Sequence, residues 1–400
     1  MIAGILKYGN DTPKCKFSVM HNTSTVRPLK QQIVNKVGGV MIVNGVNMLP
    51  GQAEYPKNQW YVIAWSHEVN SEKTIAREVC DEPVVLYRTE AGEVKALFNR
   101  CPHRGMPLHS DTGRIVNDTL MCGYHGIRFG ADGRCVEIPS GGVIPNKLCV
   151  KSYPVVELSH WIWIWPGDPQ SADTSLIPDH FELGLTDPSL FSEPGITLEV
   201  KANYLMPLEN LVDATHITFL HHGLIDTGNV ATHPYRLEVA GGRIATVREF
   251  TNEPLPPMLK ASMGIKGERV DRKLTLTAYA NHLAQISQEF IDVDDPEAAP
   301  GRLELVVALT PAGPKRTVQY ALFATSFENK HPGRFDDLRR LLMEDVVVIE
   351  EIQILFDTLG AENAPEVSVK SDEANIRSRR FIADSVAAER SLIPSRSVEA

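Results

Sequence analysis

Two short stretches, "CPHRGM" at residues 101–106 and "CGYHGI" at residues 122–127, decide how this chain is interpreted. Each stretch holds one cysteine and one histidine, with glycine beside them. Two thiolates and two imidazoles on two short loops can enclose a metal centre, because glycine lets the backbone come close to the metal and its sulfurs. The candidate ligands are Cys101, His103, Cys122 and His125.

Three interpretations of these four residues compete. Simple packing is the least favoured, because both histidines lie among polar and glycine neighbours. Zinc accepts two sulfurs and two nitrogens, but the usual zinc finger groups its cysteines together and its histidines together. In a Rieske [2Fe–2S] cluster two cysteines hold one iron and two histidines hold the other, which fits one residue of each type per loop. The motif therefore favours a Rieske cluster.

The two stretches resemble the cluster loops of Rieske non-haem iron oxygenases. They differ from the loops of cytochrome bc-type Rieske proteins, which a disulfide joins. Met106 and Tyr124 stand where those cysteines would be, and they cannot form a disulfide. The resemblance implies a cluster of the lower-potential, oxygenase type.

Length and composition are those of a two-domain globular protein with 400 residues, 43% of them hydrophobic. The net charge of −10 with dispersed signs argues against nucleic acid as a partner. No secretory signal and no run of eighteen apolar residues is recognisable, so we expect a soluble, cytoplasmic protein without membrane association. Six cysteines without a regular framework favour thiolate ligands or free thiols over disulfides.

Three regions follow from the pattern of turns and periodicity. Residues 1–52 are an extension of unknown role, or translation begins at Met48. Residues 53–167 read as a small all-β Rieske domain of short strands, closed by the alternating strand "HWIWIW" that we interpret as core. Residues 168–395 read as a catalytic domain with an antiparallel sheet covered by helices, so the fold class is α+β.

A second constellation lies in the helical segment "ENLVDATHITFLHH", which contains Asn210, Asp213, His216 and His221. Two neutral imidazoles and one carboxylate form the facial triad of non-haem Fe(II) oxygenases. Residues five apart diverge by about 140° on an ideal helix, so His221 must lie where the helix ends or unwinds. His222 is its rival. The segment resembles the oxygenase pattern Asn-x-x-Asp-x-x-His-x-x-x-x-His, which favours His221 and gives Asn210 and Asp213 catalytic roles.

The carboxylate ligand is expected from the later helical segment. "LLMEDVVVIEEIQ" resembles the long helix of the branch that contains the vanillate O-demethylase and dicamba monooxygenase oxygenase components. This resemblance selects Asp345, with Glu344 and Glu350 as alternatives. A solvated helix face is the competing interpretation for each of the three acids.

The resemblance also assigns a bridge between the two metals. Family members are similar in being homotrimers, in which the cluster of one subunit lies near the iron of the next. By that resemblance Asp213 would accept hydrogen bonds from His125 of a neighbour and from His216 of its own chain.

The function implied is that of a terminal oxygenase component. It would use dioxygen to monooxygenate an aromatic or related small molecule, with oxidative O-demethylation and formaldehyde release as the specific expectation. No Gly-x-Gly-x-x-Gly follows a strand, so electrons would come from a separate NAD(P)H-dependent reductase or a ferredoxin. The alternatives are a ring-hydroxylating dioxygenase, a non-catalytic Rieske electron-transfer protein with a ligand-binding domain, and a zinc-stabilised binding module.

The substrate pocket has weaker candidates in the sequence. Asn281 and His282 lie on an expected strand from which they could face the cavity. The segment "TNEPLPPMLKASMG", residues 251–264, is a candidate loop or lid over the cavity. For each of these, an ordinary surface or core position is an equally good interpretation.

Overall fold

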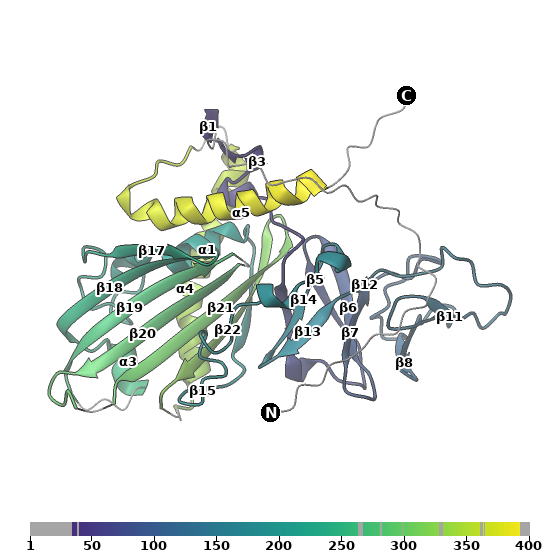
Figure 1. Ribbon diagram of the computed structural model, residues 1–400, viewed down its shortest axis with the longest axis horizontal. Helices are drawn as coiled ribbons and strands as arrows, with labels where there is room; N and C mark the ends of the chain where they lie inside the picture. The colour runs from purple at the N-terminus through teal and green to yellow at the C-terminus, as the bar shows by residue number, and fades with distance from the viewer. Residues whose placement is uncertain are drawn as a thin grey trace.

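The computed structural model describes residues 34–37, 40–262, 267–280, 282–297, 299–327, 331–360, 363 and 365–392. Two domains lie side by side (Figure 1). We call the one with the two cysteine–histidine stretches the loop domain and the one with the long strands the sheet domain. The expected α+β class, an all-β part followed by an antiparallel sheet with helices, is confirmed.

The loop domain is built of short antiparallel strands in three small sheets, with orders β12-β7-β6-β5, β13-β14-β4 and β11-β10-β9-β8. Frequent turn residues keep the strands short. The strands are β4 (Tyr61–Trp65), β5 (Ile75–Val79), β6 (Glu82–Arg88), β7 (Val94–Phe98), β8 (Arg114–Val116), β9 (Thr119–Met121), β10 (Arg128–Phe129), β11 (Cys135–Glu137), β12 (Ser152–Tyr153), β13 (Val155–Leu158) and β14 (Trp161–Ile164).

The sheet domain has one eight-stranded antiparallel sheet of order β15-β22-β21-β20-β19-β18-β17, and β16 also pairs with β22. Long alternating segments form its central strands, because one face of the sheet must meet the covering helices. The strands are β15 (Phe191–Ser192), β16 (Ile196–Val200), β17 (Arg236–Ala240), β18 (Arg243–Pro254), β19 (Arg269–Tyr279), β20 (Leu283–Asp292), β21 (Gly301–Gly313) and β22 (Arg316–Thr325).

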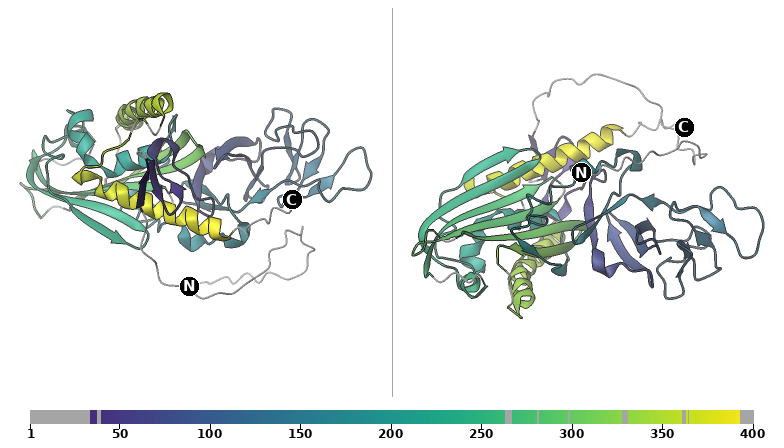
Figure 2. Two further views of the ribbon diagram at one scale, coloured as in Figure 1. Left: turned by 90° about the horizontal axis from the view of Figure 1, so that it is seen from above. Right: turned by 60° about the horizontal axis from the view of Figure 1, so that its bottom comes forward.

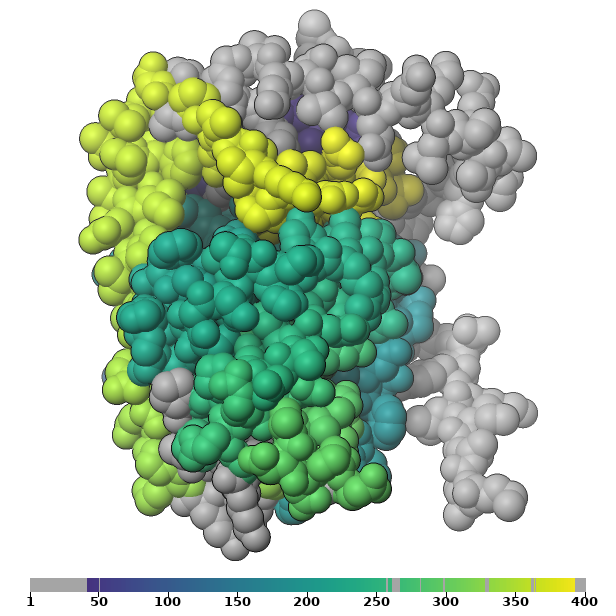
Figure 3. All heavy atoms as spheres, turned by 90° about the vertical axis from the view of Figure 1, so that its left-hand side faces the viewer, coloured from purple at the N-terminus to yellow at the C-terminus, as the bar shows by residue number. Residues whose placement is uncertain are grey.

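Within the described residues, five α-helices accompany the sheet. They are α1 (Leu205–Val212), α2 (Ile217–Leu220), α3 (Pro257–Ser262), α4 (Arg334–Leu359) and α5 (Glu373–Leu392). Figure 2 shows α4 projecting from one face of the sheet. In the space-filling view, α5 runs across the upper border of the sheet domain (Figure 3). Within the described ranges, no helix combines the length and apolar character that crossing a membrane requires.

Strand β14 forms the boundary between the two domains. Trp161 and Trp163 belong to an apolar cluster with residues of β20, β21 and β22, such as Leu322. Ile162 and Ile164, on the other side of the strand, pack into the core of the loop domain. The expectation of a core strand is correct, and both of its faces are buried because a domain covers each one.

Residues 41–49 contribute to the sheet domain's core. Strands β1 (Val34–Val37), β2 (Val40–Val43) and β3 (Val46–Asn47) form a small sheet. Val46 and Met48 are fully buried in the same cluster as α1 and α5, and the views show α5 beside these strands (Figures 1 and 2). The sequence assigned this stretch no role; its apolar residues help to hold α5 in place.

Candidate metal centres

The two cysteine loops have the same backbone construction. In each loop the cysteine amide donates a hydrogen bond to the carbonyl oxygen five residues later, at 2.8 Å in both loops. The amide of the glycine four residues after the cysteine donates back to the cysteine carbonyl oxygen, at 2.9 Å for Cys101 and 3.0 Å for Cys122. Gly105 and Gly126 close these turns with φ of 79° and 71°, a region that side chains disfavour. The glycines are therefore required by the turn itself.

The side chains of the two loops are arranged for one shared centre. Cys101 and Cys122 are almost fully buried, whereas His103 and His125 are exposed with their rings 4.6 Å apart. Burial raises the pKa of the Cys101 thiol to about 11, so a bound cation is needed to hold it as thiolate. Buried sulfurs and outward imidazoles fit a cluster whose histidine-bound iron faces out of the domain.

Neighbouring residues fix the two loops against each other. A Cβ on Gly123 would lie 1.9 Å from the Thr112 hydroxyl oxygen, so this glycine permits close contact between segments. Asn99 accepts main-chain hydrogen bonds from Leu108 and His109 at 2.9 and 3.1 Å and so shapes the end of the first loop. Cys80, Cys101, Cys122 and Cys135 form no disulfide within the described ranges, and Cys15 lies outside those ranges.

The second centre depends on a break in the helix that carries it. Helix α1 ends at Val212, and Asp213 leaves the helical conformation with φ −105° and ψ 105°. A 3-10 turn, Ala214–His216, and the four-residue helix α2 follow. His221 lies just after α2 with φ −99° and ψ 27°. The expectation that His221 sits where the helix ends is correct, and an additional break at Asp213 was not expected.

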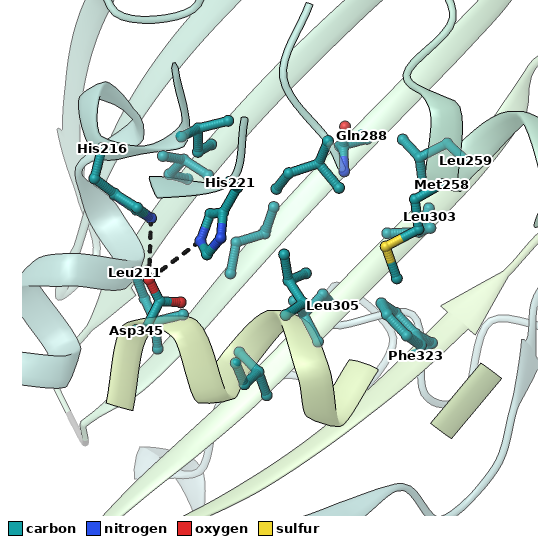
Figure 4. A pocket seen from close by; sticks show the side chains of 16 residues that line it. Leu211, His216, His221, Met258, Leu259, Gln288, Leu303, Leu305, Phe323 and Asp345 are labelled. Carbon is teal, nitrogen blue, oxygen red and sulfur yellow. Dashed lines mark ion pairs between the residues drawn. The ribbon is translucent and has the colours of Figure 1, made fainter. Parts of the chain in front are cut away.

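Two histidines and one aspartate converge at this break. Asp345 Oδ1, on α4, lies 3.1 Å from His221 Nε2 and 3.5 Å from His216 Nε2. One ligand atom from each of the three residues fits within 4.8 Å of the others. Figure 4 shows the three side chains pointing toward one another. Two imidazoles and a carboxylate on one side of a space constitute the donor set of a facial triad.

The other ring nitrogen of each histidine is already engaged. His216 Nδ1 lies 2.6 Å from the main-chain oxygen of Asp213, and His221 Nδ1 lies 2.8 Å from Glu344 Oε2. Because both partners are acceptors, each Nδ1 carries the proton and each Nε2 keeps its lone pair for a metal. The residues present thus fit an iron ion held by two Nε2 atoms and one carboxylate.

Protonation of the two histidines differs because their surroundings differ. Burial lowers the pKa of His216. Burial also opposes charge on His221, but its hydrogen bonds to Asp345 and Glu344 and their negative charges outweigh burial and raise its pKa. A bound dication would replace the proton that these carboxylates attract.

The remaining sequence candidates have clear places. Asn210 Nδ2 donates to Asp345 Oδ1 at 3.1 Å, so it orients the carboxylate. The Asp213 carboxylate accepts hydrogen bonds from the amide and the hydroxyl of Thr215. From the sequence we expected this carboxylate to contact His216, but the main-chain oxygen of Asp213 makes that contact instead.

The alternatives to the chosen ligands point elsewhere. The His222 side chain is 81% exposed and lies 3.6 Å from Asp226. Glu350 accepts from the Lys201 amide. Glu344 touches His221 on the side away from Asp345, as a partner of a ligand. The structure therefore brings together the same three residues that the sequence favoured.

An apolar pocket adjoins the three converging residues. It lies between the sheet, from β19 to β22, and helices α1, α3 and α4. Within the candidate lid segment, helix α3 contributes Met258 and Leu259 to this lining. The apolar side chains that line it are Leu211, Ile217, Ile225, Met258, Leu259, Leu276, Ile286, Leu303, Leu305, Phe323, Leu341 and Leu342.

One residue of the pocket was missed, and one candidate was wrong. Gln288 is the polar lining residue outside the histidine–aspartate group. The alternation of the strand could have indicated this residue. One side of β20 carries the side chains of residues 284, 286, 288 and 290, and only Gln288 among them is polar. His282 lies outside this lining, fully buried between Tyr61 and Tyr204, because its strand end meets the domain boundary. Asn281 is outside the described residues.

Models of two known protein families match the two parts of the chain that carry these sites. Residues 59–154 match the Rieske [2Fe–2S] domain, and residues 200–388 match the vanillate O-demethylase oxygenase C-terminal domain. The fold and the two sets of ligands define a protein with a Rieske cluster and a mononuclear iron. The chain belongs to the Rieske non-haem iron oxygenases.

Individual relatives are consistent with this family. A crystal structure of dicamba monooxygenase bound to dicamba superposes with a TM-score of 0.75 and 30% identity, covering 84% of this chain and 98% of that one. The iron–sulfur subunit of a toluene-4-sulfonate monooxygenase system from Comamonas testosteroni is 38% identical over 215 residues. The oxygenase component of dicamba O-demethylase from Stenotrophomonas maltophilia is 42% identical over 174 residues. These alignments cover 53% and 43% of this chain, and 60% and 50% of the respective relatives.

Proposed function

We propose that this chain is the terminal oxygenase component of a multicomponent system and that it monooxygenates small aromatic ethers, removing a methyl group. The observation that carries the proposal is the convergence of His216, His221 and Asp345 on the wall of an apolar pocket. The same chain supplies two loops built for a Rieske cluster.

The chain's own residues have distinct tasks in this reaction. When bound, the iron would supply activation of dioxygen, and the cluster would supply electrons one at a time. Asn210 and Glu344 hold Asp345 and His221 in the ligating orientation through hydrogen bonds at 3.1 and 2.8 Å. The apolar lining keeps water away from the methyl group beside the triad. Hydroxylation of that methyl group gives a hemiacetal, which releases formaldehyde.

Electron transfer requires a second copy of the chain. Strands β8 to β11, which border the cluster loops, lie at one end of the molecule, whereas the sheet and α4 lie toward the other (Figures 1 and 2). The histidines of the cluster loops are exposed, and α4 presents exposed apolar side chains, including Ile354 at 63% and Leu355 at 55%. These features support a homotrimer in which each cluster serves a neighbour's iron, with Asp213 near the contact.

The electrons enter from outside the chain. The two matched families account for a cluster and an iron site, and the sequence carries no recognisable nucleotide-binding motif. A separate NAD(P)H-dependent reductase, alone or with a ferredoxin, is the partner we propose.

Metal analysis of two variants tests the two centres separately. The wild type is expected to hold about three irons per chain and to show a Rieske visible spectrum. His216→Ala removes one ligand of the mononuclear site, so the variant keeps the spectrum and loses about one iron. Cys122→Ser removes a cluster ligand, so that variant loses the spectrum and about two irons. A colourless wild type, or no iron loss in His216→Ala, contradicts the assignment.

Oxygen uptake with a surrogate reductase tests the reaction. Aromatic methyl ethers are expected to give formaldehyde in step with oxygen consumption in the wild type and none above background in His216→Ala. Formation of a cis-diol would show a ring-hydroxylating dioxygenase. Oxygen-independent electron transfer alone would show an electron carrier with a ligand-binding domain.

A further inference from the structure

The far end of the pocket carries a hydrogen-bonding group whose orientation is fixed. Gln288 lies across the pocket from His216, His221 and Asp345, with apolar side chains between (Figure 4). Arg272 Nη1 donates to Gln288 Oε1 at 3.2 Å. A guanidinium can only donate, so it accepts no hydrogen bond and must face the oxygen of the amide. The Gln288 NH₂ group is left to face the cavity, as Figure 4 shows.

The positive charge behind Gln288 is already neutralised. Arg272 forms a buried ion pair with Glu253 through Nε and Nη2, and both side chains are about 3% exposed. Glu253 also accepts from the Thr227 hydroxyl at 2.9 Å. The carboxylate of Asp226 is close enough to act on Arg272 electrostatically. This end of the pocket therefore holds no net positive charge that a substrate anion could use.

The described lining residues contain no lysine or arginine. Burying a carboxylate among aliphatic side chains without a cation is strongly unfavourable, because the charge loses its hydration. A neutral oxygen or nitrogen acceptor loses much less and gains one hydrogen bond from the Gln288 amide. The described lining residues therefore offer an acid no cation to compensate its charge, whereas Gln288 offers a donor to a neutral acceptor.

We propose that the pocket selects uncharged, largely apolar methyl ethers that carry one hydrogen-bond acceptor, such as a ketone, amide or nitrile, at the end opposite the methyl group. Gln288 receives that acceptor and so determines which end of the molecule meets the triad. This inference rests on the proposed function, which supplies the methyl ether as the reacting group. The preference for uncharged over charged ligands can be measured by binding alone.

Calorimetric binding with a matched pair of ligands tests the proposal. The pair is 4-methoxyacetophenone and 4-methoxybenzoate, titrated anaerobically into the reduced holoenzyme. The ketone is expected to bind at least about tenfold more tightly than the acid, since only the acid must be desolvated as an ion. An acid that binds as tightly as the ketone, or no preference for the neutral member in further amide and nitrile pairs, overturns the proposal.

Two variants of Gln288 separate its role from simple packing. Gln288→Glu keeps an oxygen for Arg272 and removes the amide donor, and Gln288→Leu removes both. We expect each to weaken ketone binding about tenfold and to leave binding of 4-methoxytoluene, which has no second acceptor, within about twofold. Glu289→Gln, on the exposed side of the same strand, is the matched control. Unchanged ketone binding in both Gln288 variants, with the cluster spectrum intact, overturns the assignment.

Formaldehyde measured in the same samples distinguishes this inference from the reaction itself. Formaldehyde from the acid but not from the ketone leaves demethylation standing and overturns the selection for neutral substrates. The expected ketone preference without formaldehyde supports the selection and overturns demethylation.

Discussion

The two metal-binding regions of this chain are organised in different ways. The proposed cluster ligands come from two short loops, each closed by its own hydrogen bonds and its own glycine. The iron ligands come from a broken helix and from α4, and the hydrogen bond between Asn210 and Asp345 joins residues 135 positions apart. The first site is a local structure repeated twice, and the second exists only when distant elements pack.

The difference extends to the residues that support each site. Main-chain groups of the same loop hold Cys101 and Cys122 in place. Side chains from other segments hold two of the three candidate iron ligands, as Glu344 does for His221 and Asn210 does for Asp345. Substitution of a neighbouring residue should therefore disturb the iron site, whereas the cluster site should be disturbed mainly by substitutions within its own loops.

The largest effect within a folded, metal-loaded protein is expected at Asp213, between the two sites. Asp213→Asn keeps an oxygen that can accept from the Thr215 amide, so the turn persists while the charge is lost. We expect full iron content and a roughly 100-fold slower oxygen uptake, because in the proposed trimer the cluster of a neighbour would lose its contact with this carboxylate. Thr215→Val, which retains the Asp213 charge, is the control. Equal slowing in both variants, or loss of iron, would refute a role in electron transfer.

A smaller effect is expected when a supporting side chain of the iron site is removed. Glu344→Ala leaves His221 Nδ1 without its acceptor, so the ring loses its preferred orientation. Iron affinity is expected to fall about 10-fold, and at most about 100-fold, as measured by competition with a chelator. The cluster spectrum should not change. Glu351→Ala, at an exposed position on the same helix, provides the comparison, and matching losses in the two variants would contradict the assignment.

The smallest effect is expected in a cluster loop. Gly105→Ala places a side chain at φ 79° without a close contact, so only backbone strain of about 1–2 kcal/mol is added. Gly141→Ala has a similar φ of 78° outside the loops and serves as the control. Both should lower the unfolding temperature slightly, but only Gly105→Ala should speed bleaching of the cluster by a chelator. Equal bleaching rates would mean that the loop tolerates the strain.

Sequence reasoning was most successful where a site is local. The spacing of Cys101 and Cys122 from their histidines and glycines indicated the cluster, and the two loops do share one construction. It also placed His221 at a helix end, since five residues cannot stay on one helical face. Residue spacing contains this information because short loops allow few conformations.

Reasoning from sequence was weaker where packing between segments decides the outcome. It selected Asp345 by resemblance, with Glu344 and Glu350 as alternatives, and the fold shows how Asp345 and Glu344 differ in their contacts with His221. It left open whether His282 faces the cavity or lies in the core, and the fold buries that ring between two tyrosines at the domain boundary. The alternation along β20 could have singled out Gln288, but its orientation depends on Arg272 and Glu253, which come from two other strands.

The sequence by itself determined the family, the order of the domains' motifs and the residue types at both metal centres, because these depend on chemistry and spacing along the chain. Only the tertiary structure decided which carboxylate meets the histidines and which charges are cancelled around the pocket. Such choices depend on distances between segments that are far apart in the chain, and those distances are set by the packing of the sheet against its helices.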